Sequence, residues 1–197
     1  MRLRLAASTL VGATTVAAAL LVATPAQADT CVTPDPCDTE VTFEVLAGDL
    51  QITVPDDVAL TNDSPPGGYA FGQLGPVLVE DLRAESGVGW TASVISTDFT
   101  TDDGADPGET IDSGNVLYCS GPATATTGSG TFTPGQAGPC TPPPAGGVPL
   151  DTEQEAFSHG TDGVGNNTAT WNPLLSVNIP LATIAGEFTG TITHSVV

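Results

Sequence analysis

Apolar and polar residues alternate in several short stretches of this chain, as they do in half-buried β-strands. Within residues 90–97, Trp90, Ala92 and Val94 fall on one side, and Thr91, Ser93 and Ile95 fall on the other. The same alternation predicts further strands over residues 41–45, 50–54, 75–83, 116–119, 154–158, 169–179 and 187–196. The Gly48-Asp49 pair between the first two predicts a hairpin turn.

No stretch of useful length after residue 28 has a helical period, and the predicted strands are separated by segments rich in glycine and proline. This pattern predicts an all-β protein, specifically an antiparallel β-sandwich with long Gly/Pro-rich loops. One loop is expected at 61–73. A longer surface excursion is expected at 120–149, whose first 28 residues carry no charged side chain. We expect one sandwich domain over residues 41–197.

The first 28 residues have the three parts of a secretory signal peptide. Arg2 and Arg4 give a positive start, an apolar run follows, and Ala26-Gln27-Ala28 forms a small-x-small cleavage site. The sequence therefore predicts a secreted protein, extracellular or associated with the cell wall, with no membrane span left after cleavage.

Cysteine content fits an oxidising compartment. Four cysteines in an exported chain indicate two disulfides, for which three pairings are open. In the local pairing, Cys31 and Cys37 pin an N-terminal arm at residues 29–40, and Cys119 and Cys140 close the glycine/proline-rich excursion.

The chain is strongly acidic, with 23 Asp and Glu residues, three arginines and a formal net charge of −20 at pH 7. Loss of the signal peptide would leave Arg83 as the only basic side chain. Nucleic acid and anionic lipid are excluded as natural partners, because both require a basic face. Arg83 can either pair with Asp81, two residues away on the same strand face, or hold an anionic ligand group.

An acidic segment follows the predicted strand over 90–97. Its carboxylates are hard oxygen ligands of the kind that calcium prefers, although their spacing does not match an EF-hand loop. The candidate ligands of a calcium ion are Asp98, Asp102, Asp103, Asp106 and Glu109. No other cofactor is predicted.

Signals of catalysis are weak. Only two histidines, His159 and His194, could act as bases, and neither a GxSxG nor an HExxH motif is present. The ten aromatic residues outside the signal peptide are few for a sugar-cleaving site and are expected to be mostly core. We therefore expect a protein without enzymatic activity.

Two blocks resemble the WxL-domain surface proteins of Gram-positive bacteria. The first joins Asp81-Leu82-Arg83 to Gly89-Trp90-Thr91-Ala92-Ser93-Val94, and the second runs from Trp171-Asn172-Pro173 to the closing segment 186–196. The Trp-x-Leu motif itself is replaced, by Trp90-Thr91-Ala92 in the first block and by His194-Ser195-Val196 in the second. High Ala, Thr, Pro and Gly content suggests an actinobacterial relative.

The resemblance implies a β-rich domain that attaches non-covalently to the cell envelope, through peptidoglycan or a surface protein. Arg83, Trp90 and Trp171 are then the candidate binding residues. Two alternatives remain open on the residues alone. One is a structural or assembly subunit, including a homo-oligomer, that pairs through an edge strand. The other is a calcium-dependent adhesion module.

Overall fold

The computed structural model describes residues 32–33, 38–60, 64–142 and 146–197. Contacts divide the chain into two units, Met1–Phe43 and Glu44–Val197. The predicted signal peptide, Cys31 and Cys37 lie outside the described residues, so the signal peptide and the N-terminal disulfide stay predictions.

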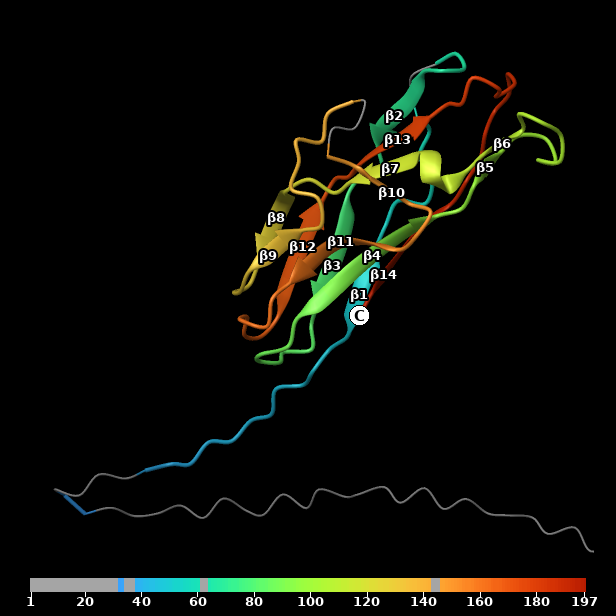
Figure 1. Ribbon diagram of the computed structural model, residues 1–197. Helices are drawn as coiled ribbons and strands as arrows, with labels where there is room; N and C mark the ends of the chain where they lie inside the picture. The colour runs from blue at the N-terminus through green and yellow to red at the C-terminus, as the bar shows by residue number, and fades with distance from the viewer. Residues whose placement is uncertain (1–31, 34–37, 61–63, 143–145) are drawn as a thin grey trace, which may run out of the picture. The chain divides into compact units, whose positions relative to one another are not determined.

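The unit Glu44–Val197 is an all-β sandwich of antiparallel sheets, which confirms the predicted fold class (Figure 1). Its first sheet has the strand order β1-β3-β12-β8. These strands are β1 (Leu50–Thr53), β3 (Val77–Asp81), β12 (Asn167–Trp171) and β8 (Ala123–Thr127). On β3 and β12 every second residue is buried, because alternate side chains of a strand point to the core.

A second sheet continues the first, with the order β10-β7-β13-β2. Its strands are β10 (Val148–Pro149), β7 (Val116–Cys119), β13 (Leu174–Asn178) and β2 (Tyr69–Gln73). Three chain segments pass from one sheet to the other, and each break contains a proline: Pro76, Pro122 or Pro173. Proline has no N–H to give to a ladder, so the sheet bends along this line.

The opposite layer is a third sheet with the order β14-β4-β11-β9. It is made of β14 (Ile192–Val196), β4 (Trp90–Ser96), β11 (Gln154–His159) and β9 (Phe132–Pro134). The two layers meet at aromatic rings. The ring of Phe157 on β11 stacks on that of Trp171 on β12, with centroids 4.9 Å apart. A short hairpin of β5 (Phe99–Thr100) and β6 (Thr110–Ile111) follows β4 in the chain. The 3₁₀ turn η1 (Ser113–Asn115) precedes β7.

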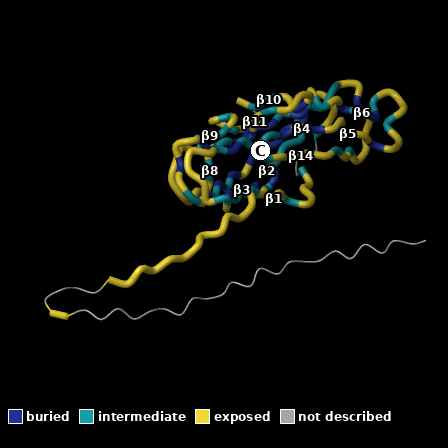
Figure 2. Tube along the Cα trace, turned by 90° about the horizontal axis from the view of Figure 1, so that it is seen from below, coloured by how far each residue is buried: buried dark blue, intermediate teal, exposed yellow. Residues whose placement is uncertain are grey.

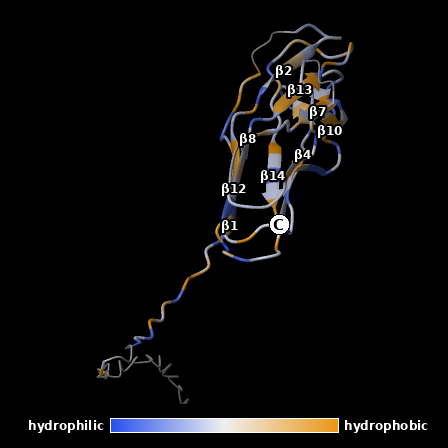
Figure 3. Cartoon of the chain, turned by 90° about the vertical axis from the view of Figure 1, so that its left-hand side faces the viewer, coloured by the Kyte–Doolittle hydropathy of each residue, from blue (hydrophilic) through white to orange (hydrophobic). Residues whose placement is uncertain are grey.

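The burial pattern follows from the two layers. Figure 2 shows buried residues concentrated along the strands and exposed ones in the connections. In Figure 3 the strands β13 and β7 are coloured as strongly hydrophobic. Four of the five residues of β13 are buried, so this strand is covered on both faces.

The structure corrects the expected surface loop at 120–149 in part. This segment contributes β8, β9 and β10, each of which adds to the edge of a sheet built by other segments. For example, Thr126 on β8 lies opposite Ala169 on β12. An edge strand needs no core of its own, which is why a stretch without charges or large apolar clusters can still form strands. Cys119 and Cys140 form a disulfide, which is the pairing of the local alternative among the three that the sequence left open.

The predicted hairpin over residues 41–54 is wrong. Its second strand exists as β1, but residues 41–47 form no strand. The Gly48 N–H donates to the Leu82 carbonyl, and the Leu82 N–H donates to the Asp49 carbonyl. Gly48 and Asp49 thus extend the pairing of β1 with β3 instead of forming a turn. A Cβ at Gly48 would lie 2.7 Å from that of Leu82, so this close pairing requires glycine.

Candidate functional site

Arg83 forms an ion pair with Asp81, one of the two outcomes that the sequence left open. Its Nε lies 2.9 Å from Asp81 Oδ1, and its Nη2 donates to Asp81 Oδ2 and to the carbonyl of Gly89. The hydrogen bond from Arg83 lowers the pKa of the Asp81 carboxyl, and the same bond raises the pKa of Arg83. Arg83, the only arginine or lysine after residue 4, is thus engaged within the fold.

The pair extends into the core through Asn167. The amide of Asn167 donates to Asp81 Oδ2 at 3.3 Å, and its Oδ1 accepts the indole N–H of Trp90 at 2.8 Å. Every member of this chain of hydrogen bonds has a partner, as buried polar groups require. It ties β3, β4 and β12 together near the start of β4.

Both tryptophans are buried core residues. The Trp90 ring lies 6.4 Å from that of Phe157, which in turn stacks on Trp171. The structure thus connects Arg83, Trp90 and Trp171 through one core region. The indole faces are covered by protein, so a ligand could reach them only after the core opened. The binding role suggested for these three residues stays a prediction.

Three of the five candidate calcium ligands accept hydrogen bonds from backbone N–H groups. Asp98 Oδ1 accepts the N–H of Ser113, Asp103 Oδ1 accepts that of Ala105, and Glu109 Oε2 accepts that of Asp106. Asp102 has a positive φ of 49°. Across the part of the chain that the structure describes, no three His, Cys, Asp or Glu side chains gather as they would around a metal ion. The calcium hypothesis stays a prediction.

The two histidines lie in different surroundings. The ring of His159 is buried 4.7 Å from that of Phe132, and its Nε2 lies 2.9 Å from the carbonyl oxygen of Ser129. His194 Nε2 lies 3.2 Å from the hydroxyl of Tyr118. Among the described residues neither histidine is hydrogen-bonded to the serine, threonine or cysteine side chain that nucleophilic catalysis needs.

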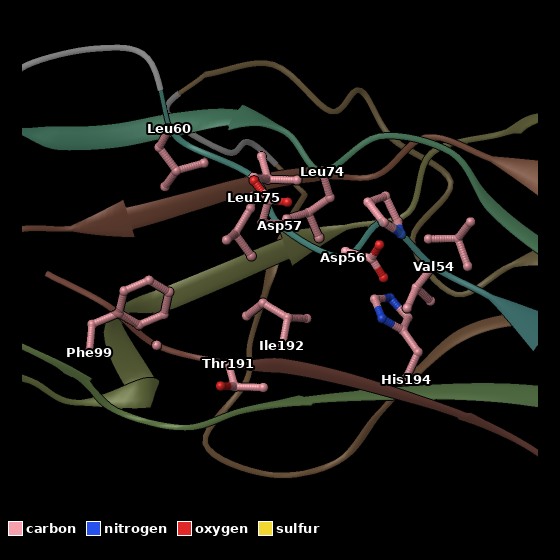
Figure 4. A pocket seen from close by; sticks show the side chains of 14 residues that line it. Val54, Asp56, Asp57, Leu60, Leu74, Phe99, Leu175, Thr191, Ile192 and His194 are labelled. Carbon is pink, nitrogen blue, oxygen red and sulfur yellow. The ribbon is translucent and has the colours of Figure 1, made fainter.

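His194 stands at one end of an apolar groove on the open side of the sandwich (Figure 4). This hollow has a volume of about 190 Å³. Its walls are β14 and the segment 54–60, and its floor is the core. Leu60, Leu74 and Leu175 point into it (Figure 4). Asp56 and Asp57 supply its carboxylates.

A second hollow of about 690 Å³ adjoins the first. Both are lined by Val58, Leu60, Phe99 and Gly190. The second is also mainly apolar, with Val177, Ile179, Ile184 and Phe188 among its lining residues. We refer to the two hollows together as the side groove. The core residues among its lining, such as Leu74, Leu175 and Val177, are themselves buried.

The second unusual feature is the described segment 38–47, which we call the arm from here on; it shares only residues 38–40 with the N-terminal arm predicted at 29–40. All ten of its residues are exposed and none belongs to a strand (Figure 2). Four of them are large and apolar. Their exposed fractions are 79% for Val41, 87% for Phe43, 73% for Val45 and 77% for Leu46. Hydrophobic and hydrophilic positions alternate over residues 41–45, and this part of the chain is drawn in alternating colours in Figure 3.

The side groove was not identified as a site from the sequence, and residues 41–45 were assigned to a hairpin strand rather than to a binding segment. The alternation at 41–45 predicted a strand that the structure does not have, because the pattern alone does not show whether a strand has a partner. The groove depends on residues from segments far apart, such as Leu60, Phe99 and Ile192, and no local pattern marks it.

Comparisons with known proteins give little support for a family. No protein-family model matches the chain, and no curated protein matches it. Among solved structures, the chain is similar to a family 123 glycoside hydrolase from Clostridium perfringens, studied for glycolipid glycan hydrolysis. The identity is 13%, the TM-score is 0.33, and the match covers 68% of this chain and 19% of that one. This likeness carries no functional argument. Within the described residues no helix is long and apolar enough to cross a membrane.

Proposed function

We propose that the protein is a non-enzymatic β-sandwich module, secreted or held at the cell surface, that associates non-covalently with the envelope by strand addition. The arm is the binding segment and a sheet edge of a surface protein is its partner. The observation that carries this proposal is the exposure of Val41, Phe43 and Val45 on a segment whose opposite face carries Thr42 and Glu44 between them.

Exposed apolar side chains in such a row are costly in water. Burying each one stabilises a complex by about 1.5–3 kcal/mol. An extended segment also offers unpaired backbone N–H and C=O groups, which a sheet edge satisfies. Since strand partners bury alternate side chains, the spacing of Val41, Phe43 and Val45 fits one apolar surface, with Thr42 and Glu44 facing out.

The chemistry of the arm favours a protein over peptidoglycan as the partner. Glycans offer hydroxyl and amide groups, which do not complement a row of aliphatic and aromatic side chains without hydrogen-bonding groups. The two tryptophans that could stack on sugar rings are buried. The acidic charge of the chain also opposes contact with polyanionic wall polymers. Peptidoglycan binding, the expectation from the WxL-like blocks, is therefore the competing outcome of the test.

The test compares two Gram-positive envelope preparations, one with its surface proteins and one of purified peptidoglycan. The chain from Asp29 is added to each, alongside Val41→Ser/Phe43→Ser/Val45→Ser and the matched control Glu40→Gln/Thr42→Ser/Glu44→Gln, which alters the opposite face. We expect wild type and control to sediment with the protein-bearing envelopes. The triple serine variant should lose at least about a thousandfold in affinity, since three side chains at about 1.5 kcal/mol or more each are removed and each 1.4 kcal/mol is a factor of ten.

Two results would contradict the proposal. Equal binding by the triple serine variant would show that the arm is not the binding segment. Binding to purified peptidoglycan that the arm substitutions do not change would replace strand addition with direct wall binding.

A further inference from the structure

The side groove contains a buried hydroxyl group that lacks a hydrogen-bond partner. Thr183 lines the second hollow and is 8% exposed, and its Oγ1 bonds to no described residue. Such atoms are rare in folded proteins, because they lose their hydrogen bonds to water without replacement. Two other side-chain atoms in the described part of the chain share this state, His159 Nδ1 and Ser176 Oγ, but their residues do not line the groove.

The backbone around Thr183 is held in place, so the free hydroxyl is not the result of a loose turn. The N–H of Thr183 donates to the Pro180 carbonyl, and the N–H of Ile184 donates to the Gly108 carbonyl. A threonine side chain has three staggered rotamers, so its hydroxyl can turn toward a bound molecule without moving this backbone. A molecule in the hollow would therefore supply the missing partner.

The hollow around Thr183 has the size and the lining of a small-molecule site. Its volume of about 690 Å³ lies within the range of about 300–1,000 Å³ that is usual for such sites. Val177 in its lining is 3% exposed, whereas Val58 and Ile184, from distant parts of the chain, are 41% and 42% exposed. The hollow is thus closed toward the core and open at these two residues, and an aliphatic ligand would remove both from water.

Every charged side chain in the described lining of the side groove is a carboxylate. These residues are Asp56, Asp57 and Glu187. His194 is neutral at pH 7, because burial lowers its pKa to about 4. The formal net charge of −20 adds to the same field. The groove therefore repels fatty acids and other anions and attracts cations.

These features together define one chemical class of ligand. An aliphatic body matches the apolar lining, a positive charge matches the carboxylates, and an N–H donor matches the oxygen of Thr183. We propose that the side groove binds a primary aliphatic amine, whose ammonium group donates to Thr183 Oγ1 and whose alkyl chain lies against the apolar lining. Such an amine is protonated at pH 7, as a lysine side chain is. This site is separate from the arm, so it stands or falls independently of the proposed function.

The experiment is isothermal titration calorimetry of the chain from Asp29 at pH 7 with three probes. Octylammonium has the full set of features, octyltrimethylammonium has the chain and charge but no N–H, and octanoate has the opposite charge. Thr183→Val removes the hydroxyl and keeps the shape of the side chain, and Thr183→Ser keeps the hydroxyl. Val58→Trp fills the open side of the hollow, and Val164→Trp, at a 66%-exposed residue outside the lining, is its matched control.

We expect octylammonium to bind wild type, Thr183→Ser and Val164→Trp at a ratio of one to one. Binding should be about tenfold weaker in Thr183→Val, since a hydrogen bond from a charged donor is lost, and at least tenfold weaker in Val58→Trp. Octyltrimethylammonium should bind wild type about as weakly as octylammonium binds Thr183→Val, and octanoate should not bind. No binding of octylammonium to wild type at millimolar concentration, or equal binding by Thr183→Val, would overturn the inference.

The stability of the free protein gives a second readout. Thr183→Val removes a buried hydroxyl without a partner, so the urea midpoint of the free protein should rise while its affinity for octylammonium falls. A threonine with a purely structural role would lower the midpoint when it is replaced. A lower midpoint for Thr183→Val than for wild type would therefore also contradict the assignment of this hydroxyl to a ligand.

Discussion

The indole N–H of Trp171 donates to the hydroxyl of Tyr118, 3.0 Å away in the core. Indole nitrogen is only a donor, so the hydroxyl oxygen accepts and its own hydrogen points elsewhere. His194 Nε2, at 3.2 Å, is the acceptor within reach. The direction of these two hydrogen bonds therefore assigns the proton of neutral His194 to Nδ1. Burial raises the pKa of Tyr118, which keeps the hydroxyl protonated.

Removing the Tyr118 hydroxyl should be costly although the ring remains. In Tyr118→Phe, the buried indole N–H of Trp171 loses its acceptor, and a buried donor without a partner costs about 1–3 kcal/mol. We expect a loss of that size in the free energy of unfolding, measured in urea, with the m-value unchanged. A cost below about 0.5 kcal/mol would show that water or a neighbour replaces the hydroxyl. Tyr69→Phe serves as a comparison at a less buried tyrosine.

His194 should make stability fall in mild acid. Burial lowers its pKa from 6.5 to about 4 in the folded protein. Between these values the unfolded chain binds a proton that the folded one does not. The contribution of His194 is therefore complete above pH 6.5 and declines as pH falls to about 4, by at most about 3 kcal/mol. Thermal melts from pH 7.5 to 4.5 should show this slope in wild type and a shallower one in His194→Leu. Equal slopes would contradict it.

The Arg83–Asp81 pair should matter most in keeping β3, β4 and β12 together. Arg83→Met leaves the Asp81 carboxylate buried without its cation, which we expect to cost about 2–3 kcal/mol after allowing for the partial exposure of Arg83. Because the pKa of Asp81 is lowered from 3.8 in the folded protein, its carboxylate stabilises the fold above that pH, and this contribution is lost as the pH falls further. The variant lacks the pair, so its free energy of unfolding should fall less than that of wild type between pH 7 and pH 3. Arg83→Lys should recover only part of the loss, since it forms a single bond. Urea unfolding at pH 7 and pH 3 measures both, and no difference between Arg83→Met and wild type would contradict the role.

The Cys119–Cys140 disulfide should stabilise the segment that supplies β8 and β9. The cysteines are 21 positions apart, and a loop of about that length stabilises a protein by about 3 kcal/mol in the chain-entropy model. Cys119→Ser/Cys140→Ser should lower the free energy of unfolding by that order. Hydrogen exchange should then be faster in β8 and β9 than in β4. Uniform acceleration would instead indicate a global role.

Alternation of side chains was enough to predict the strands in the middle of the sheets. Trp90, Ala92 and Val94 are buried as expected, and β7 has the predicted bounds. The edge strands were less predictable, because Thr- and Gly-rich segments such as 123–127 form strands through pairing with a neighbour rather than through their own pattern. The predicted strand at 169–179 is interrupted by Pro173, which cannot donate to a ladder.

The candidate site shows the limit of sequence reasoning more sharply. The Arg83–Asp81 pair could be anticipated because its members are two positions apart. Asn167, which joins the pair to Trp90, lies far away in the chain and was not identified. The arm was assigned to a hairpin because Gly48-Asp49 is a common turn sequence, whereas close packing on Leu82 uses the same glycine to extend β1.

Hydrogen exchange at the amides of the arm tests the central proposal most directly. The measurement compares residues 41–46 in the free chain at micromolar concentration with the same residues in chain bound to protein-bearing envelopes. We predict fast exchange in the free chain, and at least tenfold slower exchange on binding, since strand addition gives these N–H groups partners. Amides that exchange equally fast in both states would contradict binding through the arm.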